Sequence, residues 1–151
     1  MNNSEDKAYR PQQAAALCLK RRKRKLYVLI ITSRQTKRWI LPKGWLEEDK
    51  TEAEVALVEA WEEAGVIADP TSPALIGSYH YDKRLRGAQE KPLEVNVYRI
   101  TSCILAKLYP ERKRRQRKWV SLKEAAKMVD EQSLKRLLLV QIESDEGNVG
   151  N

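Results

Sequence analysis

The chain has 151 residues, the length of one domain and enough to bury a core without disulfide bonds. Hydrophobic residues make up 42% of it and charged residues 33%, which excludes a disordered chain and indicates a folded globular one. The net charge is +8, from 29 Lys and Arg against 21 Asp and Glu. That excess predicts an anionic partner, either a phosphorylated small molecule, nucleic acid or an anionic membrane surface.

Further classes of protein are excluded by short segments. No apolar run approaches the roughly 18 residues that a membrane helix needs, so no membrane partner is expected. The polar start of the chain, residues 1–7, lacks the apolar stretch of a secretory signal. Cys18 and Cys103 lie in apolar segments, which favours reduced thiols in a cytoplasmic protein. Because His80 is the only histidine, a metal site built from Cys and His is nearly excluded.

The first elements predicted in chain order are strands. Apolar, β-rich segments at 14–19 and 26–33 flank six consecutive bases at 20–25, a pattern typical of a hairpin. A short extended segment follows at 38–41 and ends at a Pro-Lys-Gly sequence. We therefore expect three strands before the first helix.

A helix is predicted over 52–64 by signals at both of its ends. Thr51 is a favourable N-cap, and Glu54 three residues later completes the pattern of a capping box. Gly65 is the typical residue just after a helix end.

The second half predicts two more strands and two helices. The segments are strands at 74–82 and 94–106, a basic loop at 109–118, a helix from a capping box at Ser121 and Glu124 to about 129, and a helix at 133–142. The order β-β-β-α-β-β-α-α predicts an α+β fold, an α/β/α sandwich with a mixed sheet. We expect one domain at 10–144, a flexible leader at 1–9 and a flexible tail at 145–151.

The helix at 52–64 carries its acidic residues on one face. At about 100° per residue, four carboxylates fall within roughly 100° of one another: Glu52, Glu59, Glu62 and Glu63. The opposite face is apolar and holds Ala53, Leu57, Ala60, Trp61 and Ala64. No Lys or Arg in the helix offsets the repulsion, whereas a bound Mg²⁺ or Mn²⁺ would. The alternative is a solvated acidic face.

The stretch from Gly44 to Val66 resembles a family motif. The residues Gly44-Trp-Leu-Glu-Glu-Asp-Lys50 and Val58-Glu59-Ala60-Trp61-Glu62-Glu63-Ala64-Gly65-Val66 are similar to the Nudix box, G-x5-E-x7-R-E-U-x-E-E-x-G-U, where U is aliphatic. Two positions depart from it, because Lys50 stands where the family has Glu and Val58 where it has Arg. The departures put catalytic rate and metal affinity in question.

The resemblance implies the Nudix fold and a metal-dependent pyrophosphohydrolase. It implies Mg²⁺, with Mn²⁺ as the alternative, held by the Gly44 carbonyl and by three carboxylates that are also the catalytic residues: Glu59, Glu62 and Glu63. The general base stays open among Glu59, Glu94 and Glu111. Such metal ions neutralise a pyrophosphate and lower the pKa of a bound water.

Basic residues near the motif are candidates for substrate binding. Lys43 adjoins Gly44, Arg34 and Arg38 precede it, and Arg114 belongs to the basic run 112–118, which resembles a specificity loop of the family. We expect a highly anionic small molecule, such as a diphosphoinositol polyphosphate, a dinucleoside polyphosphate or another nucleoside diphosphate derivative. Two alternatives are a nucleoside triphosphate pyrophosphatase that sanitises the nucleotide pool, and a non-catalytic module that binds RNA or nucleotide. A monomer or a homodimer is expected.

Overall fold

The computed structural model describes residues 11–84 and 90–149, so the predicted leader at 1–9 lies outside the described residues. Within them the chain forms nine strands and three helices. Their bounds are β1 Pro11–Arg22, β2 Lys25–Thr32, β3 Trp39–Ile40, β4 Lys43–Trp45, α2 Glu52–Ala64, β5 Val66–Ile67, β6 Ala74–Arg84, β7 Glu90–Ile100, β8 Ile104–Leu105, β9 Arg117–Ser121, α3 Leu122–Met128 and α4 Gln132–Val149.

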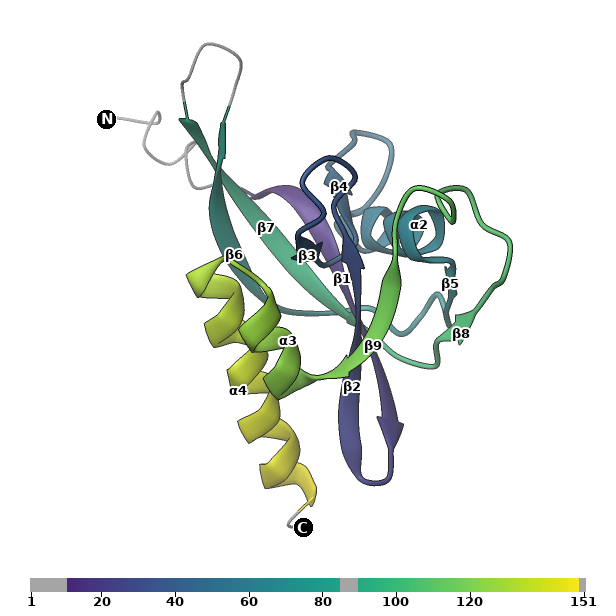
Figure 1. Cartoon of the computed structure of the whole chain (residues 1–151), viewed down its shortest axis with the longest axis vertical. Helices are drawn as coiled ribbons and strands as arrows, with labels where there is room; N and C mark the ends of the chain where they lie inside the picture. Colours follow the sequence, from purple (N-terminus) through teal and green to yellow (C-terminus); the bar gives the residue numbers. More distant parts are fainter. Residues whose placement is uncertain (1–10, 85–89, 150–151) are drawn as a thin grey trace.

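A mixed sheet forms the middle of the molecule (Figure 1). Its strands run in the order β3-β2-β1-β7-β6, with β4 added to β1 and β9 added to β2. β1 and β7 are parallel, and the other pairs are antiparallel. The short strands β5 and β8 form a separate two-stranded sheet.

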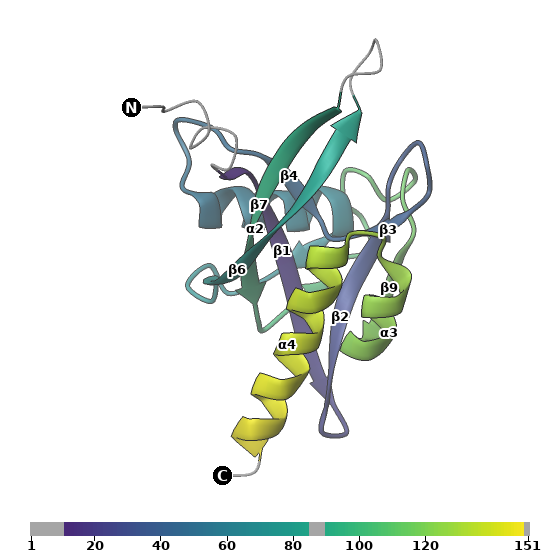
Figure 2. The same cartoon turned by 90° about the vertical axis from the view of Figure 1, so that its left-hand side faces the viewer.

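Helices cover both faces of the sheet, with α2 on one side and the α3–α4 pair on the other (Figure 2). β1 is buried from residue 13 to residue 19 because both of its faces are covered. Its side chains alternate between two cores: Ala15, Leu17 and Leu19 face α3 and α4, whereas Ala14, Ala16 and Cys18 face α2. The predicted α/β/α sandwich with a mixed sheet is confirmed.

The ends of α2 are fixed as the sequence predicts. The Glu54 amide donates to Thr51 Oγ1 at 3.1 Å, and the Thr51 amide donates to Glu54 Oε1 at 2.9 Å, so both halves of the capping box form. Gly65 ends the helix at φ 67°, and a Cβ there would lie 2.5 Å from the Tyr109 ring. Only glycine satisfies both the left-handed backbone and the close contact.

The predicted hairpin at the basic run is confirmed, with a two-residue turn. Arg22 pairs with Lys25, so the turn consists of Lys23 and Arg24, at φ 51° and 69°. Two consecutive positive φ angles are those of a type I′ turn, which usually takes Asn-Gly. The turn of this hairpin therefore consists of two basic residues whose backbone is strained.

Several predicted boundaries differ from the structure, and the short strands β4, β5 and β8 are not among the predicted elements. Part of the predicted basic loop is the strand β9, which pairs with β2 from Arg117 to Ser121 and hides its pattern because one face is solvated. β7 ends at Ile100 rather than 106, and Ser102 takes φ 57° before β8. α4 continues to Val149, past the predicted end at 142. In the described part of the chain, no helix is long and apolar enough to cross a bilayer.

Candidate active site

A cleft of about 1140 Å³ opens above the N-terminal half of β1. One wall is α2 with β4, and the other is the end of β6 with the turn between α3 and α4. The lining residues on which the argument depends are Gln13, Arg34, Arg38, Lys43, Gly44, Glu59, Glu63, Tyr81, Asp130 and Glu131. Segments from both halves of the chain therefore build one polar site.

Gly44 brings the backbone of β4 against the carboxylate of Glu59. β4 is held by pairing with β1, where Gly44 lies opposite Ala14. A Cβ at position 44 would lie 2.5 Å from Glu59 Cδ and 2.8 Å from its Oε2. Any side chain at this position would displace the Glu59 carboxylate, so the close approach requires glycine.

Glu63 is buried and has partners on both carboxylate oxygens. Its Oε1 accepts from the Lys43 amide at 3.1 Å, and its Oε2 accepts from Arg115 Nη2 at 3.2 Å. The side chains of Glu63 and Arg115 are each 9% exposed. Burial raises the pKa of Glu63, and the charge of Arg115 opposes that rise.

Arg115 joins three parts of the site. Besides Glu63, its Nε donates to Glu111 Oε1 at 2.9 Å and its Nη1 donates to the Thr32 carbonyl at 3.1 Å. A guanidinium can bind all three acceptors at once because its five donors lie in a rigid plane. The loop that carries Glu111 is also fixed to α2, since the Glu111 amide donates to the Glu62 carbonyl at 3.0 Å.

The pKa of Glu59 is set by burial and by other carboxylates rather than by a cation. Burial, followed by the charges of Glu63, Glu62 and Glu111, raises the pKa of Glu59 to about 7. The rise indicates negative charge that nearby side chains leave uncompensated, which a divalent cation would relieve. In residues 11–84 and 90–149, no group of three or more His, Cys, Asp or Glu side chains is placed to hold a metal ion, so backbone oxygens would have to contribute ligands.

The opposite wall carries two carboxylates between α3 and α4. Asp130 is 64% exposed and lies 3.5 Å from Arg38 Nη1, whereas the Glu131 side chain is only 10% exposed. Glu131 Oε2 lies 3.6 Å from the same Arg38 nitrogen. Its Oε1 is buried and has no hydrogen-bond partner in the described part of the chain.

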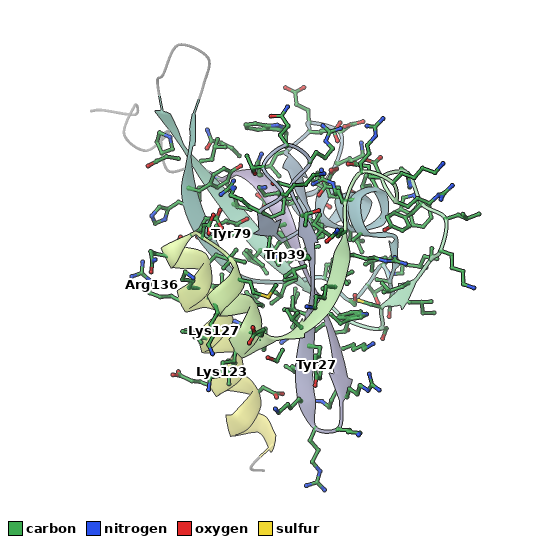
Figure 3. The ribbon with its side chains drawn as sticks, in the orientation of Figure 1. Tyr27, Trp39, Tyr79, Lys123, Lys127 and Arg136 are labelled. Carbon is green, nitrogen blue, oxygen red and sulfur yellow. The ribbon has the colours of Figure 1, made fainter. Side chains whose placement is uncertain are left out.

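Lys43 and Tyr81 line the cleft, and Tyr79, which stacks on Tyr81, is buried in the core. Lys43 Nζ lies 5.4 Å from the centre of the Tyr81 ring, and burial lowers the pKa of Lys43 while Glu63 and Glu131 oppose that change. The Tyr81 ring stacks on Tyr79 with 6.3 Å between centroids, and Figure 3 shows Tyr79 near the α3–α4 turn. The Tyr81 hydroxyl donates to Gln13 Oε1 at 2.8 Å, so its proton is engaged.

The structure brings most of the predicted site residues together. Those in the cleft are Gly44, Glu59, Glu63, Arg34, Arg38 and Lys43. Glu62 is half-buried next to Glu63 but does not line the cleft. Arg114 lines a separate depression of about 610 Å³ with Lys37 and Trp39. Of the two further base candidates, Glu111 adjoins the acidic cluster, whereas Glu94 binds Ser78 Oγ at 3.2 Å and lies outside the cleft lining.

Two residues of the acidic helix differ from their predicted surroundings. Glu52 does not join the other carboxylates, because its Oε1 accepts from Asn96 Nδ2 at 2.7 Å and from the Tyr98 hydroxyl at 2.9 Å. It ties α2 to β7. Trp61 is 37% exposed rather than packed, because α2 turns Val55, Ala56, Ala60 and Ala64 toward the sheet instead.

Arg115, Tyr81 and Glu131 belong to the site but escape sequence reasoning. Arg115 is one of six bases in 112–118, and nothing in that run distinguishes the one that becomes buried. Glu131 follows the end of α3 as an ordinary polar residue between helices. Its place over the cleft depends on how α4 packs on β6, which is a tertiary feature.

Comparisons with known proteins identify the family. Residues 10–139 match the model of the NUDIX domain. Nudix hydrolase 12, mitochondrial, from Arabidopsis thaliana is 32% identical over 117 residues, which are 76% of this chain and 57% of that protein. Nudix hydrolase 4 of the same plant is 26% identical over 130 residues, 83% of this chain and 60% of that protein. The chain thus spans less than two thirds of the length of these relatives.

Solved structures share the fold at low identity. The binary complex of a C. elegans Ap4A hydrolase superposes with a TM-score of 0.61 at 18% identity, over 91% of this chain and 99% of that one. The NUDIX domain of Shewanella oneidensis NrtR, complexed with ADP ribose, superposes with a TM-score of 0.61 at 16% identity, over 95% of this chain and 99% of that one. These structures show the fold alone, whereas the family model, which covers residues 10–139, shows that the chain belongs to the NUDIX domain family.

Proposed function

We propose that this chain is a Mg²⁺- or Mn²⁺-dependent hydrolase that cleaves a phosphoanhydride bond in a phosphorylated small molecule. The observation that carries the proposal is the contact of Gly44 with Glu59 beside a cluster of mutually repelling carboxylates. Two structural neighbours, an Ap4A hydrolase and a domain complexed with ADP ribose, support a substrate with a pyrophosphate linkage. A cytoplasmic location stays a prediction, since the name of one relative places it in mitochondria.

Hard oxygen ligands suit the proposed cation. The Gly44 carbonyl, Glu59 and Glu62 would hold it, because both oxygens of Glu63 already accept hydrogen bonds. When bound, a divalent ion neutralises the pyrophosphate and acidifies a water. Glu63 then acts chiefly by fixing β4 to α2 through the Lys43 amide, which keeps Gly44 and Glu59 in register.

The basic residues of the cleft would bind the phosphate groups. Lys43 lies beside Gly44 on β4, and Arg34 lines both the cleft and an adjoining depression of about 650 Å³, whereas Arg38 is already paired with Asp130 and Glu131 on the opposite wall. Their positive charge draws an anionic substrate toward the carboxylates on α2. Among the substrates expected from the sequence, dinucleoside polyphosphates and other nucleoside diphosphate derivatives agree in kind with Ap4A and ADP ribose.

A second candidate function is binding of a nucleotide without turnover. The engagement of both Glu63 oxygens favours it, because one of the three carboxylates that the family resemblance assigns to the metal is then already occupied. Lys50 also departs from the family motif and forms a local ion pair with Glu47 at 3.2 Å. The two candidates differ in whether hydrolysis follows binding.

The test is a side-by-side turnover screen. Dinucleoside polyphosphates, nucleotide sugars, diphosphoinositol polyphosphates and nucleoside triphosphates are offered with Mg²⁺, then with Mn²⁺. We expect metal-dependent phosphate release from at least one class, lowered about 100-fold or more by Glu59→Gln and by Glu62→Gln. Glu124→Gln on α3 is the matched control and should keep full activity. Turnover in excess chelator, or binding of nucleotides without any turnover, would overturn the proposal.

A further inference from the structure

The wall of the cleft opposite α2 contains an incomplete hydrogen-bond site. Glu131 lines the cleft, its side chain is 10% exposed, and its Oε1 has no partner within the described residues. A buried carboxylate oxygen without a donor is costly, because it has lost its hydration without replacement. Such an atom is unusual in a native protein and indicates that a partner joins it from outside the chain.

The position of Glu131 is fixed before any ligand binds. Its Oε2 lies 3.6 Å from Arg38, and its carbonyl accepts from the Lys135 amide at 3.0 Å in the first turn of α4. Ser133 anchors that turn to β6, since its Oγ accepts from the His80 amide at 3.0 Å and donates to the His80 carbonyl at 3.2 Å. The backbone that carries Glu131 is therefore anchored to β6 and to the start of α4, and Arg38 lies beside its other carboxylate oxygen.

The charges around Glu131 select the kind of partner. Arg38 lies near both Asp130 and Glu131, and Lys43 is close enough for the Glu131 charge to act on its pKa. Arg38 and Lys43 thus already offset the negative charge of Glu131, and they would repel a further metal ion. A phosphate would meet two carboxylates side by side. What remains is a neutral group that donates a hydrogen bond, such as a hydroxyl or an amine.

We propose that Glu131 binds a hydrogen-bond donor on the organic part of the substrate, either a sugar hydroxyl or the amino group of a base. This inference rests on the proposed function and gives the substrate an orientation. The phosphoanhydride lies against Gly44 and Glu59, and the organic group lies against Glu131 and the Tyr81 ring. The cleft accordingly takes a phosphoanhydride attached to a donor-bearing group, in preference to a polyphosphate alone.

The experiment measures binding rather than turnover. The probes are α,β-methylene-ADP, which resists hydrolysis, and methylenediphosphonate, which is the same anionic group without the nucleoside. Dissociation constants are measured by calorimetry with Mg²⁺ for the wild type, Glu131→Gln and Asp130→Asn. We expect Glu131→Gln to weaken α,β-methylene-ADP about tenfold and to leave methylenediphosphonate within twofold. Asp130→Asn, which removes a neighbouring charge, should change both constants by the same factor.

A further variant distinguishes the effect of the negative charge at position 131 from the effect of side-chain length. Glu131→Asp keeps the negative charge but withdraws the carboxylate by one methylene, so it should weaken α,β-methylene-ADP and spare methylenediphosphonate. The melting temperature of unliganded Glu131→Gln should equal or exceed that of the wild type, because the substitution removes a buried charge with an unpaired oxygen. A lower melting temperature with equal loss for both probes would show a merely structural role and overturn the proposal.

Two analogues identify the source of the donor. The 2′,3′-dideoxy form of α,β-methylene-ADP lacks the ribose hydroxyls, and its purine riboside form lacks the amino group of the base. The proposal holds if one analogue binds wild type and Glu131→Gln equally. It is overturned if both analogues remain sensitive to Glu131→Gln, or if α,β-methylene-ADP binds both proteins alike. Absence of turnover together with a selective loss here would refute the proposed function and leave this assignment standing.

Discussion

Two basic segments of similar sequence have opposite roles in the fold. The run 20–25 forms the tip of the β1–β2 hairpin, where the side chains are mostly exposed and Arg21 pairs with Asp145 of α4. In the run 112–118, Arg115 is buried against Glu63, and Arg117 donates to two backbone carbonyls. The basic residues behind the net charge of +8 therefore have two different roles. Those of the hairpin are solvated, whereas those of the run 112–118 include residues that hold the site together.

Arg115 also explains a departure from the family motif. Val58 stands where the motif has an arginine, and the sequence alone suggests that the helix carboxylates have lost their cation. In the fold, Arg115 reaches the same helix from the loop before β9 and binds Glu63 at 3.2 Å. A guanidinium is thus present at the acidic cluster, although it comes from a different element.

The largest expected effect is that of Arg115→Ala. The change leaves the buried Glu63 and the partly exposed Glu111 without their cation, which should cost about 3 kcal/mol of unfolding free energy and lower kcat/KM about 10- to 100-fold. Urea unfolding and steady-state kinetics measure the two effects. Arg114→Ala, one residue away and lining another depression, is the matched control and should change stability by less than about 0.5 kcal/mol.

The same experiment can be sharpened by moving the arginine. Val58→Arg in the Arg115→Ala background places a guanidinium at the position that the family motif uses. If Arg115 stands in for it, the double variant should recover part of kcat without recovering the full stability, because Glu111 and the Thr32 carbonyl still lack their donor. No recovery would mean that Arg115 acts only by fixing the loop.

The second effect in size is expected at Arg117. Its Nη1 donates to the Ala64 carbonyl and its Nη2 to the Ala106 carbonyl, each at 2.8 Å, and it lies 4.6 Å from the Tyr109 ring centre. Since Ala64 ends α2, the cation also lies at the negative end of the helix dipole. Arg117→Met should lower the unfolding free energy by about 2 kcal/mol. Lys118→Met is the control, and equal losses in thermal melts would contradict the assignment.

A third prediction concerns the acid that no arginine compensates. Because the pKa of Glu59 is raised from 4.5 to about 7, the metal-free folded protein binds a proton more tightly than the unfolded chain. The stabilisation of the folded state by this proton on Glu59 is fully present below pH 4.5 and is lost as the pH rises through 7. Glu59 is half exposed, so solvent screening reduces the loss to about 1–2 kcal/mol. Melts in chelator should show this decline, and Glu59→Gln should flatten it.

How far sequence reasoning reaches depends on whether a feature is local. The α2 helix, its capping box and the clustering of Glu59, Glu62 and Glu63 depend on spacing along one element, so they could be predicted. Arg115 and Glu131 join the site through packing between segments far apart in the chain, which leaves no periodic signal. The first two residues of β9 fall within the predicted loop 109–118, because basic residues on its solvated face hide the strand pattern.

The smallest expected effect is that of replacing the two basic residues in the hairpin turn, which tests whether their charge contributes to activity. Lys23 and Arg24 occupy a turn whose two positive φ angles disfavour side chains with a Cβ, so their replacement by Asn-Gly should relieve strain. We expect Lys23→Asn with Arg24→Gly to raise the unfolding free energy by about 1 kcal/mol and to leave kcat/KM unchanged. If kcat/KM falls, the hairpin bases help to bind substrate, and the contrast between the two basic segments is wrong. If only stability rises, the strained pair serves neither the fold nor the reaction, and the functional part of the positive charge is confined to the cleft and the loop beside it.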